Sequence, residues 1–191
     1  MMKRILILIS LIFTINLTAN VQYDHVLTTA SSLSIAVNNV DKKFEDALLL
    51  EETILKNFNP SGVKVLKRTI NGSDFELLIE KSIFGFVKRF LIVGNVNIER
   101  KSSGCQPTEN AYEAFFDFSK SGPDVTDAVA AFGLTICTIK LNETALNIKT
   151  NNALYYRGKK YGMITEPIAK SVLNDQVAAF FNSVKTTINS L

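Results

Sequence analysis

The segment PIAKSVLNDQVAAFFNSVKTTINSL, residues 167–191, predicts one long helix at the end of the chain. Thr165 and Pro167 mark its start, because a hydroxyl residue followed by proline is typical of a helix N-terminus. At about 100° per residue, one set of apolar side chains falls on a single face. This set is Leu173, Val177, Phe180, Phe181, Val184, Ile188 and Leu191. The opposite face is polar with little charge, so we expect the helix to lie on the concave face of a sheet.

The preceding residues, from Val63 to about Arg157, supply that sheet. Their hydrophobic period is mostly two, which predicts β-strands in the runs 63–70, 75–83, 86–101, 111–119, 128–141, 144–150 and 153–158. Asn71-Gly72 is a hairpin signal, and short turns join most runs. The pattern therefore predicts an α+β fold with a curved antiparallel sheet of about six to seven strands. Glycines at 85, 94 and 133 are sites where the sheet can curve.

Several predicted strands are apolar on both faces. In FVKRFLIV, residues 86–93, the even positions include Phe86 and Phe90, and the odd positions include Val87 and Leu91. One face of this strand can cover a core or a cavity, while the other meets a second element or a partner. The sequence therefore marks an apolar sheet face as a candidate surface for a protein partner.

The first half of the chain adds a strand and a helical segment. LTTASSLSIAV, residues 27–37, alternates apolar and small or polar residues, as a strand does. Residues 41–59 form an amphipathic helical pattern, but Glu51 falls in the middle of its apolar face. Two interpretations remain open. Either the segment divides into two short helices near Glu51-Glu52, with the carboxylate at a rim, or a buried acid with a shifted pKa takes part in chemistry.

The N-terminus has the layout of a secretory signal peptide. Lys3 and Arg4 precede an apolar run, residues 5–17, and Thr18-Ala19 follow it. We expect cleavage after Ala19, a single domain over 20–191, and a periplasmic or secreted location. Loss of two basic residues leaves 19 basic against 18 acidic groups. This near-neutral balance argues against a nucleic-acid partner.

The two cysteines are expected to form a disulfide, because export places the chain in an oxidising compartment. A hairpin centred near Ser121, at the Gly122-Pro123 turn signal, would place Cys105 directly opposite Cys137. Closing such a loop stabilises the fold by roughly 3 to 4 kcal/mol in the chain-entropy model.

The order of strand, helical segment, antiparallel strands and long closing helix resembles the helix-grip superfamily, the START-like group that includes polyketide cyclases and lipid-transfer domains. The resemblance covers residues 27–191 and rests on element order, on DKKFEDALLLEETILKNF and on the closing helix. It implies a hydrophobic cavity between sheet and helix that holds a lipid or another apolar molecule. The residues expected to line it are Phe90, Phe116, Phe118, Leu173, Val177, Phe180 and Val184.

Signals for catalysis are weak throughout the sequence. His25 is the single histidine, no Gly-x-Ser-x-Gly elbow or phosphate loop occurs, and paired cysteines leave no zinc ligand set. We therefore expect no catalytic residue, no metal and no cofactor. The stretch 151–167 combines tyrosines with Arg157, Lys159 and Lys160. By resemblance it borders the cavity mouth, where it would be a gate or a contact for an anionic headgroup. The favoured interpretation is an edge strand and loop with solvated charges and amphipathic tyrosines.

Three functions follow from these patterns. The first is an exported binding protein for a hydrophobic small molecule or lipid. The second is a cavity enzyme of the cyclase or hydrolase type. The third is an interaction protein whose interior is filled by its own side chains, among them several of the thirteen phenylalanines. The first is favoured, and an open pocket would separate it from the third.

Overall fold

The computed structural model describes residues 23, 25–36, 40–60, 62–83, 85–126, 129–142, 144–157 and 166–191. The predicted signal peptide, Lys159 and Lys160 lie outside the described residues. Within the described part of the chain, no helix has the length and apolar character needed to cross a membrane.

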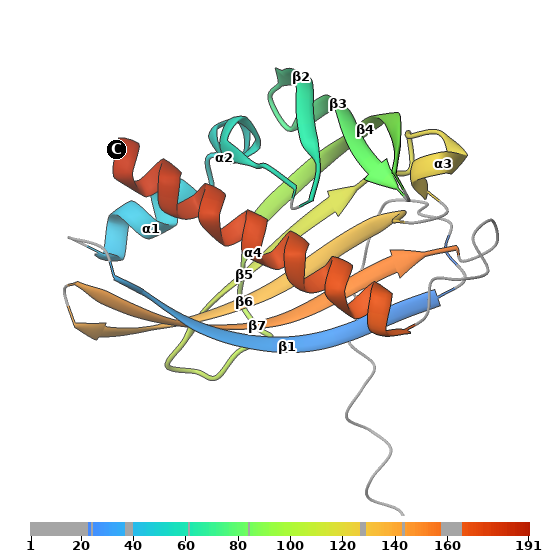
Figure 1. The fold of residues 1–191 in the computed structure, drawn as a ribbon. Coiled ribbons are helices and arrows are strands. Elements are labelled where there is room, and N and C mark those ends of the chain that lie inside the picture. The colour runs from blue at the N-terminus through green and yellow to red at the C-terminus, as the bar shows by residue number, and fades with distance from the viewer. Residues whose placement is uncertain are drawn as a thin grey trace, which may run out of the picture.

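The core architecture is one curved antiparallel sheet with the strand order β1-β7-β6-β5-β4-β3-β2 (Figure 1). The strands are β1 (His25–Ala36), β2 (Lys64–Asn71), β3 (Asp74–Ile83), β4 (Phe86–Lys101), β5 (Asn110–Asp117), β6 (Ala131–Asn142) and β7 (Ala145–Tyr156). From β2 to β7 each strand pairs with the next, so the predicted meander is confirmed. The runs 144–150 and 153–158 belong to one strand, β7, which also pairs with β1.

The closing helix α4 (Glu166–Ser190) lies across the concave face of this sheet (Figure 1). Its predicted apolar face is buried at Leu173, Val177, Phe180, Phe181, Val184 and Ile188. Leu191, which was expected to belong to this face, follows the last helical residue and is 54% exposed. The prediction of a sheet that grips the helix is confirmed.

The helical segment after β1 divides into α1 (Val40–Leu48) and α2 (Glu51–Asn57). The Glu51 carboxylate is half-buried, and its Oε1 accepts a hydrogen bond of 2.7 Å from the backbone N–H of Ile98 in β4. β3 ends its pairing with β4 at Asn95, so Ile98 lies where the strand edge needs another acceptor. The two-helix interpretation is therefore confirmed, and Glu51 joins α2 to the sheet.

Gly94 lies where β4 changes partners, from β3 over Phe86–Asn95 to β5 over Asn95–Lys101. A Cβ atom at Gly94 would lie 2.2 Å from the carbonyl oxygen of Asp117 and 3.1 Å from the Phe75 ring. Only glycine allows this close approach of backbone. Gly85 instead has a φ of 82° and forms the β3–β4 turn.

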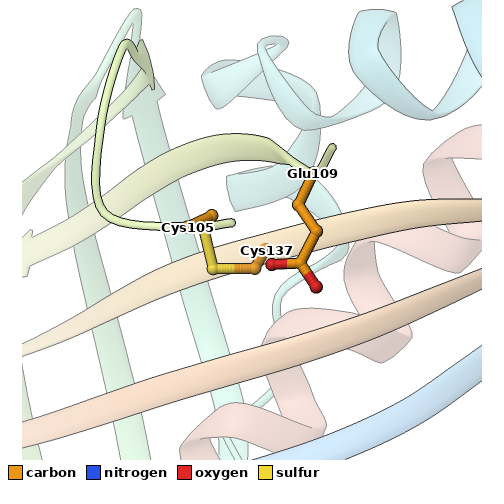
Figure 2. Close-up of side chains that lie close together, drawn as sticks. All are labelled: Cys105, Glu109 and Cys137. Atoms are coloured by element: carbon orange, nitrogen blue, oxygen red, sulfur yellow. A yellow bond between two sulfur atoms is a disulfide. The ribbon is translucent and has the colours of Figure 1, made fainter. Parts of the chain in front are cut away.

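The predicted disulfide between Cys105 and Cys137 is present, with a Cα–Cα distance of 5.6 Å. The register used to predict it was wrong. Ala111, not Cys105, faces Cys137, because the short helix α3 (Pro123–Thr126) lengthens the connection and centres the hairpin near Asp124. Cys105 belongs to the loop before β5, and this loop reaches β6 through the bond (Figure 2).

Candidate functional site

An aromatic cluster occupies the space between the middle of the sheet and α4. The Phe116 and Phe132 rings stack with centroids 4.3 Å apart, and the Phe180 ring meets Phe116 edge-on at 5.9 Å. Phe58 stacks on Phe116 from the α2 side, with centroids 5.4 Å apart. These rings are closely packed with one another and fill the centre of the concave face.

Six of the seven residues expected to line a cavity lie together in the hydrophobic core: Phe116, Phe118, Leu173, Val177, Phe180 and Val184. The seventh, Phe90, is half-buried and packs against the edge of this core. Val177 alone among the seven also lines the surface hollow that is described next. Contact between these side chains and a ligand stays a prediction.

A hollow of about 480 Å³ opens between β1 and the first two thirds of α4. Buried Val177 and Phe181 and half-buried Leu33 give it an apolar floor. The remaining lining residues are smaller or polar: Thr29, Ala30, Ser31, Lys170, Asn174, Ala178 and Asn182. β1 is an edge strand of the sheet (Figure 1). One side of the hollow therefore lies at the open edge of the sheet.

A group of polar side chains interrupts the apolar concave face directly behind this hollow. Thr29 of β1 faces Asn152 of β7, and Ser31 faces Thr150. The Asn152 Nδ2 donates hydrogen bonds to the Thr29 hydroxyl at 3.3 Å and to the Ser31 hydroxyl at 3.1 Å. We call Thr29, Ser31, Thr150 and Asn152 the polar island.

Two atoms of the polar island are buried without a partner. Asn152 is 1% exposed and Thr150 is 2% exposed. Among the described residues, no group forms a hydrogen bond with the Asn152 Oδ1 or the Thr150 Oγ1. Nearly all buried polar groups in folded proteins pair with protein or with ordered water, so each of these two atoms has capacity for a further hydrogen bond.

No protein-family model and no curated protein matches the sequence. A conserved protein from Geobacillus kaustophilus is similar in fold, with a TM-score of 0.50 and 14% identity over 86% of this chain and 96% of that chain. The chain has the helix-grip fold.

Two further helix-grip structures are similar at lower scores. A START superfamily protein from Mycobacterium smegmatis has 12% identity and a TM-score of 0.46, over 85% of this chain and 97% of that chain. A point mutant of norcoclaurine synthase from Thalictrum flavum has 12% identity and a TM-score of 0.49, over 87% of this chain and 96% of that chain.

The tyrosines of residues 151–157 do not all face the interior of this helix-grip sheet. Tyr155 alternates with core residue Leu154 and packs on the outer face, 6.0 Å from the Phe115 ring and 4.8 Å from the Tyr23 ring. Burial raises the pKa of the Tyr155 hydroxyl to about 12, and the nearby Tyr23 and Glu113 contribute in the same direction. Tyr155 is therefore a neutral packing residue rather than a contact for an anionic headgroup.

Cys105, Cys137 and Glu109 bring three potential metal-binding atoms together (Figure 2). The two sulfur atoms are joined to each other, and thiolate is the form of cysteine that binds metals. The Glu109 carboxylate accepts hydrogen bonds from Lys149 Nζ at 2.9 Å and from the Gln106 N–H at 3.1 Å. In this oxidised form the three residues fasten the loop before β5 to the sheet.

Sequence reasoning missed the polar island because β7 was read as two short strands, 144–150 and 153–158. In the continuous strand, Leu146, Ile148 and Leu154 share one face with Thr150 and Asn152. Polar residues at inward positions of an otherwise apolar alternation were the signal that could have identified them.

Proposed function

We propose that the protein is an exported binding protein for an apolar small molecule or lipid, held between β1 and α4. The observation that carries this proposal is the hollow of about 480 Å³ with its floor of Leu33, Val177 and Phe181. Its volume falls within the range of roughly 300 to 1,000 Å³ found for small-molecule sites. An apolar body would cover the floor and leave polar groups at the Lys170 and Asn174 rim.

Export is supported by two features of the chain. The first 19 residues have the pattern of a cleavable signal peptide. The Cys105–Cys137 disulfide is a bond that persists in oxidising compartments and is rare in the cytosol of most organisms. We therefore favour a carrier that acts in the periplasm or outside the cell.

The test is native mass spectrometry of the protein recovered from its own host envelope, followed by organic extraction of the bound molecules. We expect a stoichiometric apolar adduct in the wild type. Ala178→Phe places a ring in the hollow and should remove the adduct, whereas Ala36→Phe adds the same ring at another exposed position. An adduct that survives Ala178→Phe, or an adduct-free mass after challenge with a lipid mixture, contradicts the proposal.

A second candidate function is protein interaction through the free end of the β3–β4 hairpin. Phe86, Val87 and Leu91 are 73%, 64% and 51% exposed there. Lys81 faces Lys88 across the same hairpin, and like charges in facing positions are unfavourable until an acidic group neutralises them. These features favour a partner with an apolar and acidic surface.

This second candidate is tested by cross-linking in the host envelope. Combined Phe86→Ser and Val87→Ser should abolish a cross-linked partner, while Leu141→Ser, which removes a side chain 58% exposed on β6, should leave it. Equal cross-linking of both variants would argue against the hairpin as the contact surface.

A further inference from the structure

We propose that Asn152 and Thr150 make the site selective for apolar ligands that carry a hydroxyl group. This inference rests on the proposed binding function and names the ligand chemistry that the same site prefers. It begins from the two unpaired buried atoms, Asn152 Oδ1 and Thr150 Oγ1.

The position of the two residues connects them with the hollow. Thr150 and Asn152 lie on the inward face of β7, between the core residues Ile148 and Leu154. Asn152 holds the hydroxyl groups of Thr29 and Ser31, and both of these β1 residues line the hollow. A ligand that enters between β1 and α4 therefore meets the β1 half of the polar island, Thr29 and Ser31, on the wall of the hollow, with Asn152 bonded behind them.

The chemistry of the two atoms defines the matching group. The Asn152 amide nitrogen is occupied by Thr29 and Ser31, so its oxygen is left as an acceptor that needs a donor. The Thr150 hydroxyl can donate or accept. A ligand hydroxyl also donates and accepts, so it can pair with either atom.

Charge favours a neutral donor over a cationic one. Lys170 is the charged residue among those that line the hollow, and it is exposed at the rim. A ligand ammonium group would bring a second positive charge toward this lysine, whereas a hydroxyl group would not. The site therefore favours an alcohol over an amine of the same length.

Selectivity follows from the cost of leaving a buried polar atom unpaired. A ligand without a donor leaves the Asn152 Oδ1 unpaired, as it already is in the ligand-free protein, whereas a ligand hydroxyl that reaches it gains a hydrogen bond. Sites built to bind a hydroxyl group reject analogues that lack it for this reason. We expect a preference of about tenfold or more.

The experiment compares 1-undecanol with its isomer decyl methyl ether, which lacks the O–H donor. Both compete with the fluorescent dye anilinonaphthalene sulfonate for the full-length wild-type protein, and native mass spectra count the bound molecules. We expect the alcohol to displace the dye at about one tenth of the ether concentration. The combined variant Thr150→Val and Asn152→Leu should bind both isomers equally.

The matched control is Thr135→Val with Asn151→Leu, a facing pair on the opposite face of β6 and β7. It should keep the alcohol preference. Thr150→Val alone, a change of nearly constant shape, should reduce the preference if the double variant does not fold. Equal binding of the isomers by the wild type would overturn this inference and leave the proposed function standing. If neither isomer binds, both this inference and the proposed function are overturned.

Discussion

Phe116 of β5 and Phe132 of β6 stack nearly parallel, with ring centroids 4.3 Å apart and an interplanar angle of 10°. Both rings are fully buried beneath α4. Because this pair and its aromatic neighbours fill the centre of the concave face, space for a ligand is displaced toward β1 and the first part of α4.

Phe132→Ala should therefore lower the stability of the protein rather than change ligand binding directly. It removes a ring that contacts Phe58, Phe116 and Phe118. We expect the free energy of unfolding to fall by about 3 to 5 kcal/mol. Urea denaturation followed by circular dichroism measures this change. A loss below about 1 kcal/mol would show that the ring cluster is loosely packed.

Thr150→Val should raise the stability of the ligand-free protein while it weakens the preference for a ligand hydroxyl. The substitution removes a buried hydroxyl that has no partner and keeps the β-branched shape. The ligand-free protein is expected to gain up to about 1 kcal/mol in the free energy of unfolding. Thermal melting of ligand-free samples provides the measurement. A loss of more than about 1 kcal/mol would mean that the hydroxyl already has a partner in the free protein.

Glu51→Ala should loosen the attachment of α2 to the sheet. The hydrogen bond from the Ile98 N–H to a charged carboxylate is worth roughly 1.5 to 3 kcal/mol, and its loss leaves the N–H unpaired. Glu52→Ala is the control, because this exposed residue forms a surface ion pair with Lys56. That pair should contribute about 0.3 to 0.5 kcal/mol. Equal effects in the two variants would contradict the anchoring role of Glu51.

Tyr155 should make stability fall in alkaline solution. Its pKa is raised by burial to about 12 in the folded protein, against about 10 in an unfolded chain. The unfolded state therefore loses its proton first, and the contribution of Tyr155, intact below about pH 10, is lost between about pH 10 and pH 12. Urea midpoints across this range should decline less in Tyr155→Phe. An identical decline in both proteins would assign the effect to other groups.

Hydrophobic periodicity in the sequence made most of the fold predictable. It indicated the sheet, the two short helices and the gripped helix. The alternation of β-strands and the apolar face of α4 depend on local spacing alone. The register of the β5–β6 hairpin was not predictable in the same way, because α3 inserts a helical turn where Gly122-Pro123 suggested a tight reversal. The disulfide was found despite this error.

The candidate site was less accessible to sequence reasoning. Val177 belongs both to the predicted lining and to the observed hollow, since its place on the helix face determined both. Thr150 and Asn152 were missed because an inward polar residue is recognised only once the strand is known to continue through it. The pairing of β1 with β7, which brings Thr29 beside Asn152, joins residues more than a hundred positions apart. Hydrophobic periodicity within a short stretch of sequence does not predict such a contact.

The most direct test of the binding site is a map of backbone amide NMR shifts as the protein is titrated with 1-undecanol. The proposed site predicts changes at Ala30, Ser31, Asn174 and Ala178, on the two walls of the hollow. Shifts confined to Phe86, Val87 and Leu91 at the exposed end of the hairpin, with none along β1 and α4, would contradict it.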